Sequence, residues 1–138
     1  MFIQITDHQG NQVGIDPLKV IKIRTSDIAD EPRRMVFVDY ASNGVFARGT
    51  LTEIVRLFAP YIRLAALHAP NGKPIFLNAD GIAAVGLDGG YDGRSVAIAS
   101  TGFENIRVPA RNKIGLRETV AEAEQIIEGA RRRAVVVK

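Results

Sequence analysis

The residues able to do chemistry in this 138-residue chain are few and far apart. His8 and His68, its 2 histidines, fall near corresponding ends of two expected strands, where they could meet as metal ligands or as an acid and base pair. Neither has a carboxylate motif or a defined nucleophile beside it, which favours turn or surface histidines. The chain has no cysteine, so thiolate metal sites, disulfides and cysteine nucleophiles are excluded. We expect no enzyme, and no metal or cofactor.

A glycine-rich segment at 88–93, DGGYDG, is the first place to look for a bound small ligand or nucleotide. Glycines let backbone amides approach a ligand, and the carboxylates of Asp88 and Asp92 suit a cation, with Tyr91 as a wall. The segment lacks the ordered oxygen ligands of a calcium loop, and it does not enter a helix as a phosphate-binding loop does. A hairpin connection is the favoured interpretation, and the ligand loop is the alternative.

The net charge of +3 is concentrated at the C-terminus, where Arg131, Arg132, Arg133 and Lys138 lie, while the rest of the chain is nearly neutral. Arginines there could contact the phosphates of a nucleic acid, and such binding would weaken with salt. At the end of a helix they also complement the negative end of the helix dipole. Four further basic residues upstream would extend the patch: Arg107, Arg111, Lys113 and Arg117.

One pattern occurs twice along the chain. A shift of 62 residues sets Ile15 over Leu77, Asp16 over Asn78 and Val20 over Ile82, so that the apolar positions coincide. Asp16 and Asn78 are best explained as residues of Asx-type turns that introduce strands. A shift of about 60 then brings strand 35–40 over 95–100, and helix 50–58 corresponds to 118–127.

Each copy predicts short strands followed by a helix. The expected strands of the first copy are FIQIT, QVGID, VIKIR, MVFVDY and VFAR, and those of the second are RLAALH, KPIFLN, GIAAVGL, SVAIA and NIRVP. Thr50 with Glu53, and Thr119 with Glu122, have the spacing of a helix capping box. The first helix should end at Pro60, and the second among the three arginines.

We therefore predict an α+β fold of two pseudo-symmetric repeats, 1–62 and 63–138, each an antiparallel sheet of four to five short strands followed by one helix. Hydrophobic residues make up 46% of the chain and charged residues 24%, which is typical of a folded globular protein. A copy of about 60 residues buries too little apolar surface to offset its own conformational entropy, so the copies should share one compact unit.

The order of elements in the second copy resembles that of the small FlbD-like proteins associated with flagella and swarming in bacteria. The segment NGKPIFLNADGIAAV carries the resemblance, which covers 62–128 and extends more loosely to 2–62, where Gly14 replaces an aromatic residue. Members of that family usually have a single copy, so a tandem arrangement is a departure. The resemblance implies a small cytoplasmic, β-rich protein that acts through partners without catalysis. Separately, we expect a bacterial or phage origin.

We expect a non-catalytic protein–protein interaction protein, such as an adaptor, an assembly factor or a small inhibitor, working through sheet edges and helix faces. Homodimerisation through an edge strand is one such interaction. A nucleic-acid-binding protein is the second class, and a small-ligand protein using 88–93 is the third. The sequence begins without a basic and apolar leader and has no long apolar run, so we expect a soluble cytoplasmic chain outside the membrane.

Overall fold

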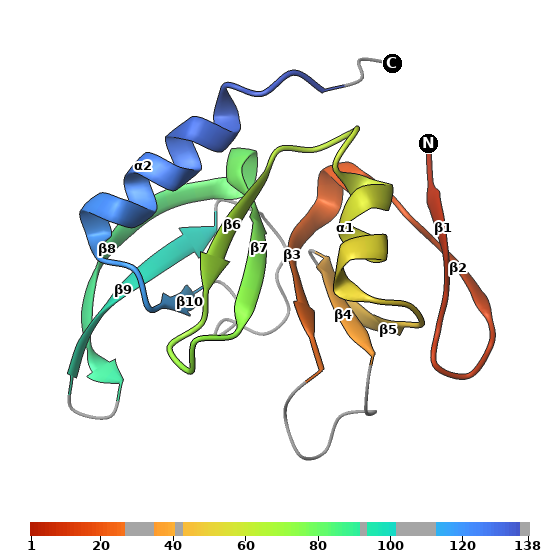
Figure 1. Ribbon diagram of the computed structural model, residues 1–138, viewed down its shortest axis with the longest axis horizontal. Helices are drawn as coiled ribbons and strands as arrows, with labels where there is room; N and C mark the ends of the chain where they lie inside the picture. Colours follow the sequence, from red (N-terminus) through yellow and green to blue (C-terminus); the bar gives the residue numbers. More distant parts are fainter. Residues whose placement is uncertain (27–34, 41–42, 92–93, 102–112, 136–138) are drawn as a thin grey trace.

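The computed structural model describes residues 1–26, 35–40, 43–91, 94–101 and 113–135. Within these ranges the fold is α+β, with two helices and three antiparallel sheets of two, three and five strands (Figure 1). The predicted α+β class and the antiparallel pairing are confirmed. Neither helix of the described chain is both long and apolar enough to cross a bilayer.

The chain up to Phe58 forms five strands, a 3₁₀ turn and a helix. They are β1 (Ile3–Thr6), β2 (Gln12–Ile15), η1 (Pro17–Lys19), β3 (Val20–Thr25), β4 (Val36–Tyr40), β5 (Asn43–Ala47) and α1 (Leu51–Phe58). Gly10 turns the β1–β2 hairpin with φ of 89°, a conformation that glycine adopts without steric cost. The Asp16 carboxylate accepts the Leu18 N–H at 3.0 Å, which introduces η1 as an Asx-type turn should.

From Leu64 onward the described elements come in the same order. The elements are β6 (Leu64–His68), β7 (Pro74–Asn78), η2 (Ala79–Gly81), β8 (Ile82–Tyr91), β9 (Arg94–Thr101), β10 (Lys113–Leu116) and α2 (Val120–Arg131). Gly72 turns the β6–β7 hairpin with φ of 88°. The predicted capping box is confirmed at α2, because Thr119 and Glu122 each accept the backbone N–H of the other. The same hydrogen bond from the Thr119 backbone lowers the pKa of Glu122.

The first hairpin of each half is fastened to its own half by the same backbone contact. In the first half the Arg48 N–H donates to the Thr6 carbonyl at 2.8 Å, at the end of β1. In the second half the Arg117 N–H donates to the His68 carbonyl at 2.9 Å, at the end of β6. Within the described residues, the other strand of each hairpin, β2 or β7, pairs with no strand of its own half besides its hairpin partner.

A joint between β3 and β7 builds the largest sheet from both halves. Its strand order is β5-β4-β3-β7-β6, and all its neighbours are antiparallel. In the joint, Lys22 lies opposite Leu77, and Arg24 lies opposite Ile75. β8, β9 and β10 form the three-stranded sheet, and β1 with β2 form the two-stranded sheet.

Two buried clusters fill the interior, and each includes a residue from the other half. The first-half cluster contains Phe58 of α1 and also Leu64 of β6. The second-half cluster contains Ile127 of α2 and also Ile21 of β3. The halves therefore share apolar contacts as well as a sheet.

Three local predictions need comment. The expectation that each half forms its own sheet of four to five strands was wrong, because β6 and β7 join β3–β5 and leave β8–β10 as a separate sheet. The expectation of a loop beginning at Asp88 was wrong as far as Tyr91, since β8 continues to that residue and pairs it with Arg94. The predicted strand 105–109 lies outside the described residues, while Lys113–Leu116, which the pattern did not mark, forms β10.

Candidate functional site

The main candidate site is the open edge of β8. This ten-residue strand pairs with β9 along one edge, and within the described residues no strand pairs with the other edge. Ala83, Ala84 and Gly86 are exposed there, and the Leu87 side chain is 71% exposed. The corresponding strand of the first half, β3, is covered by β7, and its Ile23 is buried.

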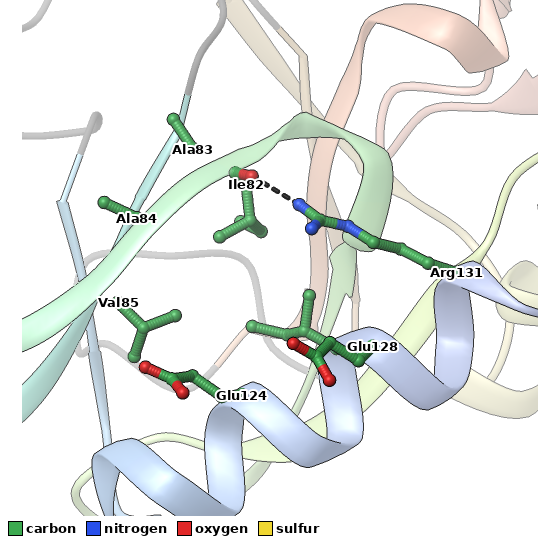
Figure 2. A pocket seen from close by; sticks show the side chains of 8 residues that line it. Ile82, Ala83, Ala84, Val85, Glu124, Glu128 and Arg131 are labelled. Atoms are coloured by element: carbon green, nitrogen blue, oxygen red, sulfur yellow. Dashed lines mark hydrogen bonds between the residues drawn. The ribbon is translucent and has the colours of Figure 1, made fainter.

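A groove runs between β8 and α2. It has a volume of about 300 Å³ and is lined by residues 82–85 of β8 and by Glu124, Ile127, Glu128 and Arg131 of α2. Figure 2 shows Glu124, Glu128 and Arg131 reaching from the helix toward the strand. We call this the β8–α2 groove. Its floor is apolar, and its rim on the helix side carries charges of both signs.

Arg131 is held in place by the backbone of its own chain. Its Nε donates to the Ala79 carbonyl at 3.0 Å, and its Nη2 donates to the Ile82 carbonyl at 2.6 Å (Figure 2). These bonds tie the C-terminal turn of α2 to η2 and to the start of β8. Arg131 therefore forms one end wall of the β8–α2 groove.

The other two arginines of the predicted anion patch also bind main-chain carbonyls. Arg132 Nε donates to the Glu128 carbonyl at 3.4 Å, and Arg133 donates to the Leu64 carbonyl. Arg63 Nε in turn donates to the Arg133 carbonyl at 2.7 Å. The Arg131–Arg133 segment thus fastens the end of α2 to β6 and η2. Of the predicted extension, Lys113 and Arg117 are exposed, and Arg107 and Arg111 lie outside the described residues.

His68 is paired with a carboxylate 50 positions further along the chain. Its Nδ1 lies 2.7 Å from Glu118 Oε2, and its backbone N–H donates to Glu118 Oε1 at 2.9 Å. The Glu118 side chain is 10% exposed. Burial raises the pKa of Glu118, but the hydrogen bonds from the ring and backbone of His68 lower it more, and the net pKa lies below the ordinary value. The pair anchors the residue before the α2 cap to the end of β6.

Replacing Glu118 by glutamine should lower the free energy of unfolding at neutral pH by about 1 kcal/mol, because a charge-assisted pair that is partly open to solvent is lost. Since the folded-state pKa of Glu118 is lowered, its stabilising contribution is complete above the unfolded value of about 4.5 and is lost as the pH falls through the folded-state pKa. The difference between wild type and Glu118→Gln should therefore vanish in acid.

Denaturant unfolding of both proteins at neutral pH and at stepwise lower pH measures this difference. Glu124→Gln, which makes the same charge change at an exposed position of α2, is the control and should show little difference at any pH. A Glu118→Gln difference that stays constant down to about pH 3, well below the ordinary pKa of a glutamate, would contradict the assignment.

The two histidines do not meet, so the alternative of a histidine pair is not realised. The His8 ring packs edge-on against Phe46, with ring centroids 6.1 Å apart, beside the β1–β2 hairpin, whereas His68 ends β6 in the other half. Figure 1 shows these two places well separated. No group of three His, Cys, Asp or Glu side chains arranged to hold a metal occurs in the described part of the chain.

The candidate ligand loop is part strand. Asp88 and Tyr91 belong to β8, and the pairing of β8 with β9 is irregular between these two residues. Asp92 lies outside the described residues. The backbone at 88–91 therefore continues the β8–β9 hairpin, as the favoured interpretation of this segment requires.

A second open edge belongs to β2. Among the described residues this strand pairs with β1 alone. The outward face of the β1–β2 hairpin carries Phe2, which is 66% exposed, together with exposed Gln4 and Gly14. A Cβ placed on Gly14 would lie 3.2 Å from the Phe2 Cβ, so the Phe2 side chain rises from beside this glycine.

No protein-family model, curated protein or solved structure matches this chain. The resemblance to FlbD-like proteins therefore stays a prediction. The functional inference rests on the groove and the two open edges.

Of the residues that form this site, sequence reasoning singled out only Arg131, and for a different role. The sequence of β8 was correctly assigned to a strand. Which of its edges is open depends on how the strands pair, and the sequence of one strand does not determine that pairing. Glu118 stands directly before Thr119, the N-cap of the second helix. That position was the one feature of the sequence indicating that the Glu118 side chain could reach another element.

Proposed function

We propose that this protein is a non-catalytic interaction protein that binds an extended protein segment along the open edge of β8. The observation that carries the proposal is that one edge of β8 pairs with no other described strand and lies beside the β8–α2 groove. Backbone hydrogen bonds to β8 would supply affinity, and side chains of the added strand that enter the groove would supply specificity.

The sequence of β8 supports this use. Exposed strand edges are normally protected against pairing by lysine, proline or a very short strand. β8 reads IAAVGLDGGY over ten residues, with no lysine, arginine or proline. Small side chains at Ala83, Ala84 and Gly86 leave the backbone accessible to an incoming strand.

We also propose that 1–62 and 63–138 are pseudo-symmetric copies that form one compact unit. The support is the same order of elements, the hairpin glycines with φ of 89° and 88°, and the matching backbone bonds at the ends of β1 and β6. A shift of 62 residues also carries the β1–β2 register, with Ile3 opposite Ile15, onto the β6–β7 register, with Ala65 opposite Leu77.

Nucleic-acid binding has less support. A phosphate-binding arginine needs a guanidinium group free to reach the ligand. Arg131 and Arg133 instead donate to carbonyls of other elements of their own chain, and Arg132 donates to the Glu128 carbonyl of α2.

A photo-crosslinking amino acid at the strand edge tests the proposal. Gly86 and Gly129 form a matched pair of positions, because a Cβ added at either one meets nothing within 4 Å. Gly86 lies on the β8 edge and Gly129 on the exposed side of α2. Each full-length variant would be irradiated in an extract of the cells that make the protein, and the products identified by mass spectrometry.

A discrete polypeptide adduct at Gly86 that is missing at Gly129 is the expected result. Equal labelling at the two positions, or no polypeptide adduct at Gly86, would overturn strand addition at β8. A nucleic-acid adduct at Gly129 without a polypeptide adduct at Gly86 would favour the second class.

A further inference from the structure

We propose that the strand received by β8 is β2 of a second copy of this chain, so that copies assemble head to tail through the same joint that links β3 and β7 within one chain. This inference rests on the proposed function and names its partner. The β3–β7 joint within one chain is the template for the proposed contact between chains. The open edges of β2 and β8 are the two surfaces that would meet in it.

The internal joint has three parts. β7 lies antiparallel to β3, with Ile23 opposite Phe76 at its centre. Asn78, at the end of β7, donates its side-chain N–H to the Val20 carbonyl at 3.0 Å. Phe76 and Leu64, on the face of the β6–β7 hairpin that is turned toward the first half, pack on the first-half cluster.

The positions equivalent to this joint are free at the two ends of the described molecule. In element order β8 stands where β3 stands in the first half, and β2 stands where β7 stands in the second. Figure 1 shows β8 at one end of the molecule and the β1–β2 hairpin at the opposite end. Because these are different surfaces, their association is head to tail and builds a ring or a filament rather than an isologous dimer.

The exposure of the equivalent residues follows the same logic. Ile21 and Ile23 of β3 are 1% and 0% exposed, whereas their equivalents at a shift of 62, Ala83 and Val85 of β8, are exposed and half-buried. Leu64 is 4% exposed in the joint, and its equivalent at a shift of 62, Phe2, is 66% exposed. The chain therefore leaves open at its ends the surfaces that it covers at its centre.

The face of the β1–β2 hairpin that would enter the β8–α2 groove carries one phenylalanine, as does the equivalent face of the β6–β7 hairpin. In β6–β7 this residue is Phe76 of the second strand, whereas in β1–β2 it is Phe2, just before the first strand. At the internal joint Leu64 and Phe76 are the contacting pair, and their equivalents are Phe2 and Gly14. The glycine leaves the space into which the Phe2 side chain rises, because a Cβ on Gly14 would crowd the Phe2 Cβ at 3.2 Å. Phe2 is thus the apolar anchor expected in the groove between Val85 and Ile127.

A polar exchange fits the same alignment. Asn78 stands at the N-cap of η2 without a side-chain capping bond and donates to the Val20 carbonyl, while its equivalent Asp16 caps η1 and can only accept. The carbonyl equivalent to that of Val20 belongs to Ile82, and Arg131 already donates to it at 2.6 Å. When the two halves are aligned at their helix N-caps, Thr50 and Thr119, the position of Arg131 in the second half corresponds to that of Ile62 in the first. The incoming Asp16 would thus meet a cation in place of an apolar side chain.

The template fixes the register. Transferring the β3–β7 pairs by 62 residues places Ala84 opposite Ile15, Val85 opposite Gly14 and Gly86 opposite Val13 of the next copy, in antiparallel orientation. Directly opposed residues of antiparallel strands have Cα atoms about 4.5 to 5.5 Å apart, within the Cα range that a disulfide spans.

Pairs of single-cysteine chains test this register, since the natural chain has no cysteine. Val13→Cys and Gly86→Cys chains, mixed and mildly oxidised, should give a linked product of two chains. Gly86→Cys mixed with Gln12→Cys, which is one residue out of register and points to the other face, should not. Gly86→Cys alone should also stay unlinked. Circular dichroism establishes that each variant is folded.

Two results would overturn the inference and leave the proposed function standing. One is a linked dimer of Gly86→Cys with itself, which indicates isologous edge pairing. The other is no link between Val13→Cys and Gly86→Cys while the photo-crosslinker at Gly86 captures a different polypeptide. No product in either experiment overturns both proposals.

Amide hydrogen exchange of the wild-type chain gives a test that needs no variant, should Val13→Cys not fold. Exchange at 12–15 and at 82–87 should slow together as protein concentration rises, because the two edges protect each other. Slowing at neither edge, or at 82–87 alone, would contradict head-to-tail assembly.

Discussion

Replacing Phe58 by alanine is expected to lower the free energy of unfolding by about 3 to 5 kcal/mol. Phe58 is 0% exposed at the end of α1, in the cluster that also receives Leu64 from β6. Removing the ring forfeits its burial and leaves a cavity between the helix and the sheet. A domain of this size is stable by about 5 to 15 kcal/mol, so the loss is a large part of the whole. Calorimetry or denaturant titration measures it.

The neighbouring Leu57 is the matched control. It is 43% exposed on the same helix, so Leu57→Ala should cost less than about 1 kcal/mol. The β3–β7 joint links the two halves, so we expect them to unfold together. Phe58→Ala should therefore speed amide exchange in β9 of the second half as well as in β4 of the first. Unchanged protection of β9 alongside lost protection of β4 would show that the halves unfold separately, contrary to a shared unit.

Replacing Phe2 by aspartate should weaken self-association by about 30-fold or more, which corresponds to about 2 kcal/mol at an anchor residue. The ring is exposed in a single chain, so its loss costs little folding stability. In the head-to-tail assembly the same position enters an apolar groove beside Glu124 and Glu128, where an added carboxylate is both desolvated and repelled. Sedimentation velocity over a concentration series measures the dissociation constant.

Leu57→Asp is the control for this effect. It also replaces a solvent-exposed apolar residue by a carboxylate, but on α1, outside both open edges. It should leave the dissociation constant within a few-fold of wild type. Equal weakening by Leu57→Asp and Phe2→Asp would mean that net charge, rather than the Phe2 contact, controls association.

The local elements were predictable because their signals are local. The hairpin glycines at Gly10 and Gly72, the Asx turn at Asp16 and the capping pair Thr119 with Glu122 each act over four residues or fewer, and the structure has them where the sequence indicates. The order of elements followed from the apolar pattern. These features depend on backbone geometry that a short segment can satisfy alone.

Partners distant in sequence were not predictable. Strand β3 accepts β7 and leaves β8–β10 as a separate sheet, and no residue of β3 specifies this choice by itself. The contact of Glu118 with His68 and the binding of Arg131 to two carbonyls likewise join elements that are about 50 residues apart within the second half. The extension of β8 through 88–91 was not predicted because glycines that permit a turn also permit an extended strand.

The molar mass of the wild-type chain in solution, measured by sedimentation equilibrium across the micromolar range, tests the central claim most directly. Head-to-tail joining of β2 to β8 predicts a mass that rises with concentration to a multiple of the 15.0 kDa chain, and a shift back toward 15.0 kDa for Phe2→Asp. A mass of 15.0 kDa at every concentration, or an assembly that Phe2→Asp leaves unchanged, would contradict it.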